Sequence, residues 1–453
     1  MASGKNVMSL RARALGAGSW SMGGYALNQL IRLATTLVMT RLLVPEVFGV
    51  MAIANMLIVG LNLLSDIGHT QNIIQSRRGD HPAFLDTAWS VQILRGGVIA
   101  ILTLLLSLAI GLAARLGWVP VGSVYADPVL PLVMATLSLT ALIAGFESTK
   151  VSTTYRSLAL RQVTLLELYS QVIGAAITFT WAVIDRSIWA MVAGAIAGTF
   201  ARALLSHLAL KGHSNRWAWE PESVRELFHF GKWLFLSSIL HFLANSGDRL
   251  LLAGLVSPTM LGLYAIAFLL INSVQLALGR VIAGVAYPAL SEVIRERPER
   301  LKKTYYKLRI LLDSGVLLLA GFFLLSGDAI VGLLYDSRYA AAGPMLQVLS
   351  ITLLALRYQV SDQCFLALGK PRLLTTLNVI RAASLYLLVP LGFHWFGFDG
   401  ALWGVVLSQF VSIPFSIYLK ARNGILDIGK EFLVLPTYLV GVMLGALLSA
   451  VRA

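Results

Sequence analysis

Long apolar runs separated by short polar connections fill the chain from one end to the other. A helix needs about 20 apolar residues to cross the hydrocarbon core of a bilayer. Runs of this kind predict thirteen membrane-spanning helices, near residues 18–43, 47–68, 88–114, 127–147, 164–184, 188–210, 231–256, 259–284, 309–334, 342–366, 372–396, 399–420 and 431–451. Strands of a membrane barrel would be about 10 residues long and would alternate in polarity, which this pattern excludes. We therefore expect an all-α polytopic membrane protein.

The composition supports this interpretation, because 57% of the residues are hydrophobic and only 13% are charged. Soluble domains carry about 25% charged residues. The formal net charge is +14, and the positions of the basic residues indicate the orientation of the chain in the membrane. Basic residues precede the first span and follow the even-numbered spans, most densely after the eighth: Arg295, Arg297, Arg300, Lys302, Lys303, Lys307 and Arg309. Positive loops stay in the cytoplasm and contact anionic membrane lipids, so we expect a cytoplasmic amino terminus and no nucleic-acid partner.

Two segments of the chain resemble each other at an offset of 213 residues. "TRLLVPEVFGVMAIA" begins at Thr40, and "AGLVSPTMLGLYAIA" begins at Ala253. Each has a proline, a glycine four residues later and then Ala-Ile-Ala, placed between two apolar runs. Proline ends a helix by removing a backbone donor. The motif therefore predicts a short hairpin that joins the first two helices of each half of a duplicated chain.

The offset carries the first span onto the seventh, so both copies enter the membrane in the same direction. Parallel repeats of this kind allow two helix bundles to move about a central site. We expect two parallel-repeat six-helix bundles, residues 1–215 and 216–425, followed by one additional C-terminal transmembrane helix in residues 426–453.

Polar residues inside the spans need a reason, because an ionisable side chain at bilayer depth costs roughly 3 kcal/mol. They fall at helical spacing on the first span and again in register on the seventh, and further polar faces occur on the tenth and eleventh spans. We expect these faces to line a water-filled cavity. The substrate-binding candidates are Asn28, Arg32, Asn245, Asp248, Arg249, Arg357 and Arg381. Guanidinium groups suit phosphate because they donate two parallel hydrogen bonds, so the predicted ligand is anionic.

Several ionisable residues carry a second interpretation of similar weight. Asp248 and Arg249 are equally explained as a pair that joins helices, and His241 more often hydrogen-bonds between helices than relays protons. Three residues are candidates for coupling to a proton or sodium ion: Asp248, Asp362 and His241. Arg95, Glu147, Glu167 and Arg280 lie near span ends, where we expect their charged groups to reach the lipid headgroups.

No enzyme motif appears in the sequence. It has no GxSxG, no P-loop, no HExxH and no cluster of cysteine and histidine at metal-binding spacing. The single cysteine, Cys364, excludes an intrachain disulfide. We therefore expect a protein that is not an enzyme and has no catalytic residue, metal or cofactor.

In order and spacing, the motifs resemble the polysaccharide flippases of the MOP (multidrug/oligosaccharidyl-lipid/polysaccharide) exporter superfamily. The resemblance covers nearly the whole chain. It includes the two hairpin motifs, "RSIWAMVAGAIAGTFARALL" from Arg186 and "YDSRYAAAGPMLQVLSI" from Tyr335. It implies a V-shaped pair of bundles that works by alternating access in the bacterial cytoplasmic membrane. The implied substrate is an undecaprenyl-pyrophosphate-linked oligosaccharide repeat unit, held by cationic residues such as Arg32, Arg249, Arg357 and Arg381.

The resemblance also suggests a polysaccharide polymerase and chain-length machinery as partners. Two alternatives stay open. A cation-coupled drug antiporter would share the fold, but would favour a carboxylate-lined cavity over arginines. A membrane glycosyltransferase or polymerase would need a larger extracytoplasmic loop than this chain has.

Overall fold

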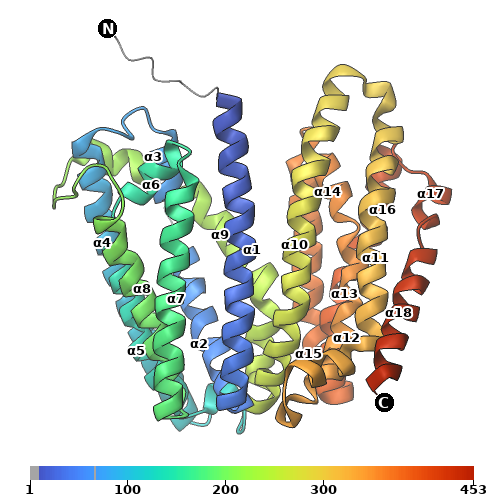
Figure 1. Cartoon of the computed structure of the whole chain (residues 1–453), viewed down its shortest axis with the longest axis horizontal. Coiled ribbons are helices and arrows are strands. Elements are labelled where there is room, and N and C mark those ends of the chain that lie inside the picture. The colour runs from blue at the N-terminus through green and yellow to red at the C-terminus, as the bar shows by residue number, and fades with distance from the viewer. Residues whose placement is uncertain (1–9, 66–67, 453) are drawn as a thin grey trace. The chain divides into compact units, whose positions relative to one another are not determined.

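The computed structural model describes residues 10–65 and 68–452, without the side chains of 10–19, 21, 22, 64, 228–241 and 452. The described part consists of helices and connections and contains no strand. Figure 1 labels most of the helices. Their bounds are α1 (Leu10–Leu42), α2 (Pro45–Leu64), α3 (His69–Gln75), α4 (Pro82–Arg115), α5 (Val129–Gly145), α6 (Lys150–Arg156), α7 (Leu160–Ile184), α8 (Trp189–Leu208), α9 (Pro221–Leu255), α10 (Pro258–Glu296), α11 (Leu301–Leu334), α12 (Ala342–Ser350), α13 (Thr352–Leu356), α14 (Gln359–Ala367), α15 (Pro371–Phe410), α16 (Ser412–Arg422), α17 (Ile428–Phe432) and α18 (Pro436–Arg452). The expectation of an all-α membrane protein is confirmed.

Within the described ranges, eight helical segments are long and apolar enough to cross a membrane, and the bent pair α5–α6 makes a ninth. The thirteen expected spans exceed this number. Helices α1 and α9, with 33 and 35 residues, are long enough to cross a membrane, but part of each lies outside the side chains that the structure describes. The tenth expected span is broken into α12, α13 and α14.

The spans expected at 372–396 and 399–420 correspond to one interrupted segment, α15 with α16. The backbone leaves the helical conformation at Phe396 and Gly397, and Gly397 has a φ of 60°. Glycine adopts this left-handed conformation without the strain that a Cβ atom would cause. The segment therefore breaks at the position that the hydropathy pattern leaves between two spans.

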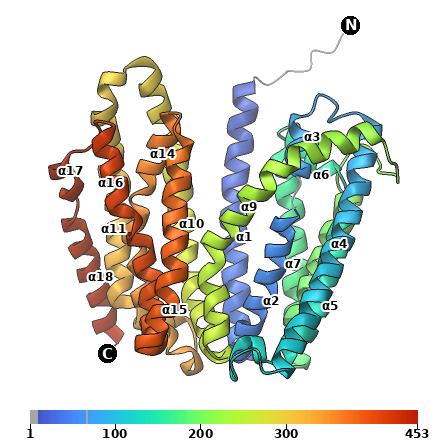
Figure 2. The ribbon, with the colours of Figure 1, turned by 180° about the vertical axis from the view of Figure 1, so that it is seen from behind.

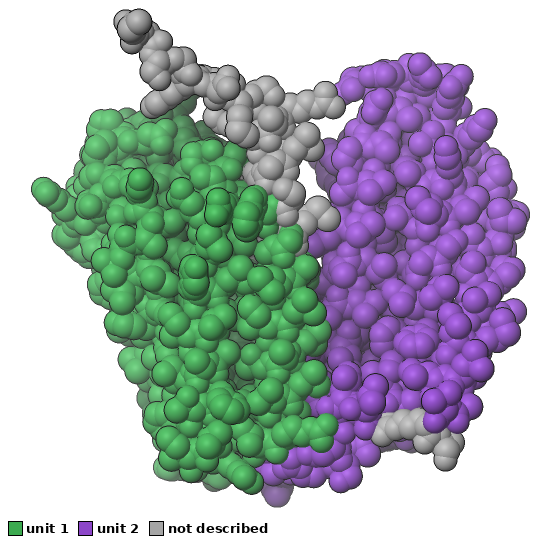
Figure 3. Space-filling view, in the orientation of Figure 1, with its two compact units in different colours: residues 1–43, 51–119, 125–241 green, residues 44–50, 120–124, 242–453 purple. Residues whose placement is uncertain are grey.

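The chain divides into two compact units, which Figure 3 colours separately. Unit 1 consists of residues 1–43, 51–119 and 125–241, and unit 2 of residues 44–50, 120–124 and 242–453. The division thus falls inside α9, at His241, and not at residue 215. The subdivision expected from sequence and the duplication that underlies it stay predictions.

The C-terminal helix α18 belongs to unit 2, where it packs along α11, as Figures 1 and 2 show. The short helix α17 precedes it and brings Glu431 into the interior of the unit. The described residues from 426 onward are therefore integrated into the packing of unit 2.

The repeated proline–glycine motif forms a reciprocal contact inside unit 2. A methyl group on Gly49 would lie 2.0 Å from the carbonyl oxygen of Pro258, and one on Gly262 would lie 1.9 Å from that of Pro45. Only glycine allows so close an approach of two backbones. The hydroxyl of Thr259 also donates to Glu46 at 2.7 Å. The two copies of the motif therefore pack on each other through equivalent positions.

Candidate functional site

Unit 1 contains a pocket of about 610 Å³ between α1, α7 and α8, here called the Arg32 pocket. Asn28 and Arg32 line it from α1, one helical turn apart, so two of the predicted residues do come together. Gln171 reaches across from α7 and donates to the backbone carbonyl of Asn28 at 3.0 Å. The hydroxyl of Thr36 donates to the backbone carbonyl of Arg32 at 2.9 Å. The hydrogen bond of this hydroxyl is therefore made within α1.

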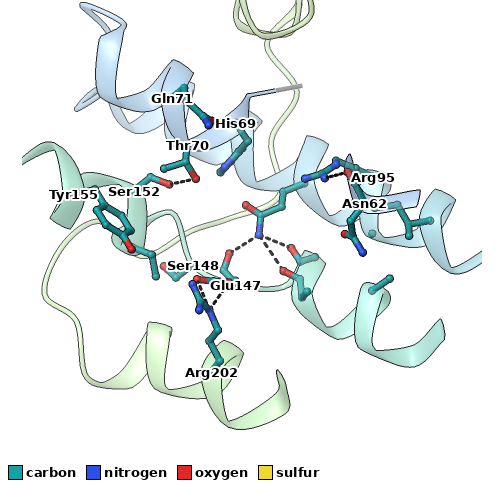
Figure 4. A pocket seen from close by; sticks show the side chains of 17 residues that line it. Asn62, His69, Thr70, Gln71, Arg95, Glu147, Ser148, Ser152, Tyr155 and Arg202 are labelled. Carbon is teal, nitrogen blue, oxygen red and sulfur yellow. Dashed lines mark hydrogen bonds and ion pairs between the residues drawn. The ribbon is translucent and has the colours of Figure 1, made fainter. Parts of the chain in front are cut away.

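A second pocket of about 300 Å³, the His69 pocket, lies between α2, α3, α4, α5, α6 and α8 of the same unit. Figure 4 shows His69 and Arg202 entering it from opposite sides. The sequence-based interpretation did not include this pocket. Its polar lining consists of Asn62, His69, Thr70, Gln71, Gln92, Arg95, Glu147, Ser148, Ser152, Tyr155 and Arg202.

Hydrogen bonds fix the wall of the His69 pocket. The amide of Gln92 donates to three carbonyls at the end of α5 and just after it, those of Ala144, Gly145 and Glu147, at 3.0–3.2 Å. This side chain holds the bend between α5 and α6 against α4. Arg95 donates to the carbonyl of Asn62 at 2.7 Å, and therefore joins α4 to α2.

Arg202 on α8 lines both pockets. It contacts the carboxylates of Glu147 at 3.2 Å and Glu167 at 3.5 Å. The hydroxyl of Tyr155 donates to Glu167 at 3.4 Å. Glu147 and Glu167 thus have a specific partner inside the unit, and Arg95 reaches the wall of a pocket. The expectation that the charged groups of these three residues reach the lipid headgroups stays a prediction.

His69 is buried in the wall of its pocket and exposes only 7% of its surface. Burial and the charge of nearby Arg95 lower the pKa of this imidazole to about 4. The ring is therefore neutral at pH 7. Among the described residues, none forms a hydrogen bond with its Nε2 atom.

In unit 2, the predicted residue Arg357 belongs to a buried ion cluster, which consists of Arg309, Asp313, Arg357, Lys420 and Glu431. Arg357 contacts Asp313 at 3.0 Å and donates to the backbone carbonyl of Glu431 at 2.6 Å. Arg309 contacts Asp313 at 2.9 Å and also pairs with Glu431. Arg357 therefore contributes to the packing of unit 2 and does not line either of the two pockets.

Asp248 and Arg249 also have partners within unit 2. The hydroxyl of Tyr264 donates to Asp248 at 2.5 Å, and Arg249 lies 3.7 Å from the same carboxylate. The guanidinium of Arg249 covers the ring of Phe268 at 4.5 Å and donates to the carbonyl of Asn245 at 3.1 Å. These contacts agree with the interpretation of Asp248 and Arg249 as a pair that joins helices.

Two further predicted residues meet each other. Arg381 lies 3.5 Å from Asp362 and donates to the hydroxyl of Ser412 at 2.9 Å. The structure thus joins a substrate-binding candidate to an ion-coupling candidate. The remaining ion-coupling candidate, His241, has a side chain outside the described residues.

The model of a family described as "polysaccharide biosynthesis protein" matches residues 38–344. The lipopolysaccharide biosynthesis protein WzxC of Escherichia coli K12 is 25% identical, over 98% of this chain and 89% of its own. The succinoglycan biosynthesis transport protein ExoT of Rhizobium meliloti is 19% identical, over 71% of this chain and 62% of its own.

Two solved structures have the same fold at low sequence identity. The lipid II flippase MurJ, in an inward closed conformation, matches with a TM-score of 0.64 and 11% identity, over 96% of this chain and 98% of its own. An inward-facing multidrug resistance MATE transporter of the MOP superfamily matches with a TM-score of 0.63 and 15% identity, over 94% of this chain and 96% of its own. The fold expected from the resemblance to MOP exporters is confirmed.

Proposed function

Because the chain belongs to the polysaccharide biosynthesis protein family, we propose that it flips a lipid-linked oligosaccharide repeat unit across the bacterial cytoplasmic membrane. The similarity to WzxC, which extends over 98% of this chain, is the observation that carries the proposal. The product would enter the assembly of a surface polysaccharide, such as an exopolysaccharide, O-antigen or capsule. The protein would then act beside a polymerase and its chain-length machinery.

The Arg32 pocket supplies chemistry that suits this substrate. Arg32 is a guanidinium at the depth of an apolar bundle, where an ionisable group marks a substrate path more often than a lipid contact. The pocket joins it to hydroxyl and amide groups on three helices, including Gln171. A guanidinium binds phosphate oxygens in a bidentate manner, and hydroxyl and amide groups bind sugar hydroxyls. The arrangement therefore favours a ligand that carries both kinds of group.

The basic connections support a cytoplasmic amino terminus. This orientation, together with the duplication, supports alternating access with the substrate loaded from the cytoplasmic leaflet. Of the predicted arginines, Arg32 lines the Arg32 pocket together with Asn28. We therefore assign the first contact with the pyrophosphate to Arg32.

To test the proposal, the gene is deleted and the chain is supplied from a plasmid. The amount of lipid-linked repeat unit in each leaflet of the membrane is then measured. The native chain should clear the cytoplasmic leaflet and restore surface polymer. Arg32→Ala should lower the clearance rate about tenfold, since a charge-assisted hydrogen bond contributes about 1.5 kcal/mol or more. Arg41→Ala, on the same helix but outside the pocket, is the matched control and should behave like the native chain.

Three outcomes decide between the alternatives. Accumulation of cytoplasmic-facing units in the deletion strain, relieved by the native chain, supports the flippase. Normal polymer with increased sensitivity to cationic drugs would replace the proposal by drug export. Full activity of Arg32→Ala would remove Arg32 from the substrate path and leave the flippase proposal in place.

A further inference from the structure

The His69 pocket is a separate cavity from the Arg32 pocket, although the two share Arg202. The proposed function assigns nothing to it. Its volume of about 300 Å³ is at the lower end of the range for small-molecule sites. The chemistry of its wall therefore decides which ligand it can hold.

His69 gives the wall a hydrogen-bond acceptor. Its ring also makes a hydrogen bond with the backbone of Ala88. Since Nε2 has no partner among the described residues, Nδ1 is the nitrogen that donates to the Ala88 carbonyl. A neutral imidazole has one N–H and one lone pair, so Nε2 presents the lone pair. A buried acceptor without a partner carries a penalty that a ligand hydroxyl would remove.

The charges around the pocket balance. Arg95 and Arg202 contribute two positive charges, while Glu147 lines the pocket and Glu167 contacts Arg202 from behind. A phosphate dianion would therefore find no excess positive charge around the pocket, and the lone pair of His69 would repel it. Hydroxyl groups both donate and accept, and therefore match a wall that offers both roles.

The other groups that reach the pocket are suited to the same kind of ligand. Thr70 and Ser152 provide hydroxyl groups, which lie 3.3 Å apart, and Asn62 and Gln71 provide amides. Ile99 and Val151 add apolar surface that would face carbon-bound hydrogens. Polar groups that converge on a partly apolar cavity are typical of a site for a compact, hydroxyl-rich molecule.

We propose that the His69 pocket binds a sugar ring, with one ring hydroxyl donating to His69 Nε2 and neighbouring oxygens accepting from Arg95 and Thr70. The inference rests on the proposed function in one respect, because it takes the ring to be a unit of the transported glycan. The pocket thus contributes to glycan selection, whereas the Arg32 pocket receives the phosphate-bearing part.

The experiment uses the purified full chain in detergent and saturation-transfer NMR. The probes are D-glucose, D-galactose and D-mannose, each compared with its L-enantiomer. The enantiomers have the same bulk effects on protein and solvent, so a difference between them reports a chiral site. At least one D-sugar should receive more saturation than its enantiomer. Equal transfer for all three pairs would overturn the proposal, as would displacement of the sugar signal by inorganic phosphate.

Variants assign the signal to this pocket. His69→Leu removes the acceptor and should weaken binding about tenfold, whereas His69→Gln retains an acceptor oxygen and should stay within about threefold of the native chain. Thr70→Val removes a hydroxyl with little change in shape and provides a second test if His69→Leu folds poorly. His394→Leu, at an exposed position of α15, is the matched control and should bind as the native chain does. Retained enantiomer preference in both His69→Leu and Thr70→Val would place the sugar elsewhere.

Transport measurements separate this inference from the proposed function. If the native chain clears lipid-linked repeat units but binds no sugar enantiomer selectively, the pocket assignment fails and the flippase stands. If it binds the sugar and clears no such units, the sugar site stands and the flippase fails. His69→Leu should slow the clearance of repeat units that carry the native glycan. Size-exclusion chromatography of the variant should show a folded protein without aggregates.

Discussion

In unit 1 the charged side chains at the depth of the helices line pockets, whereas in unit 2 a comparable set is enclosed by protein. The side chain of Arg202 is 36% exposed, and its partner Glu167 is 31% exposed. In the ion cluster of unit 2, Arg309 and Asp313 expose only 2% and 1% of their side chains. The same residue types therefore serve a solvated site in one unit and a sealed junction in the other.

The difference teaches that an intramembrane charge is not by itself evidence of a substrate path. In unit 2, Glu431 on α17 accepts contacts from Arg309 and Lys420, and so fastens the C-terminal segment to α11 and α16. In unit 1, Arg32 faces a cavity. Neighbouring helices decide which role a charged residue takes.

The largest expected effect is the loss of the ion cluster. Glu431→Ala leaves Arg309 and Lys420 buried without their shared carboxylate, which should lower the free energy of unfolding by about 3–5 kcal/mol. Cys364 is the only cysteine and is buried, so its reaction with a maleimide fluorophore during heating reports unfolding of unit 2. The matched control Glu296→Ala removes an exposed carboxylate paired with Arg295 and should unfold at the native temperature. Equal unfolding temperatures for the two variants would contradict the sealed junction.

The second effect concerns pH and unit 1. The pKa of His69 is lowered to about 4 in the folded chain. Between pH 6.5 and 4, the imidazole is therefore protonated in the unfolded chain but stays largely neutral in the folded chain. Stability from this residue is complete above about pH 6.5, and about 3 kcal/mol is lost as the pH falls to 4. The other charged groups that line its pocket are Arg95, Glu147 and Arg202. Thermal melting followed by circular dichroism at pH 7.5 and 4.5 measures the loss.

His69→Gln isolates this contribution, because glutamine does not titrate. The fall in melting temperature between the two pH values should be smaller in the variant than in the native chain. An unchanged fall would mean that His69 is not held neutral by its surroundings.

The smallest effect is expected for Arg202→Met in unit 1, which is compared with the equivalent substitution in unit 2. Arg202→Met leaves Glu147 and Glu167 partly solvated through the pockets and should cost about 1 kcal/mol or less. Arg309→Met leaves carboxylates buried and should cost about 3–5 kcal/mol. Circular dichroism melting of both variants gives the two losses side by side. Losses of equal size would show that the two charge sets are equally enclosed.

Much of the fold follows from the pattern of the sequence. Apolar runs of about 20 residues determine where most of the helices lie, because backbone groups in a bilayer must bond within their own helix. The repeated motif predicts equivalent turns, and Pro45 and Pro258 do begin α2 and α10. The pattern does not reveal that Gly49 and Gly262 pack on each other, since a contact between copies depends on the positions of both.

The candidate site was only partly accessible to sequence reasoning. Asn28 and Arg32 lie one turn apart on one helix, so their proximity follows from helical periodicity. Glu147 and Arg202 are 55 residues apart, and no local pattern connects them. His69 lies at the start of a seven-residue helix, and its sequence neighbourhood gives no sign that it faces a cavity.

The sequence by itself determined that the protein lies in a membrane, where most of its helices are, and which residues are costly to bury. These properties depend on composition and on spacing along one helix. Tertiary structure decided which costly residues face a cavity and which neutralise one another. Arg32 and Arg357 look alike in the sequence, yet the first lines a pocket and the second contacts Asp313. The reason is that the free energy of a buried charge depends on the partners that other helices bring within a few ångströms, and that information is not local to any segment of the chain.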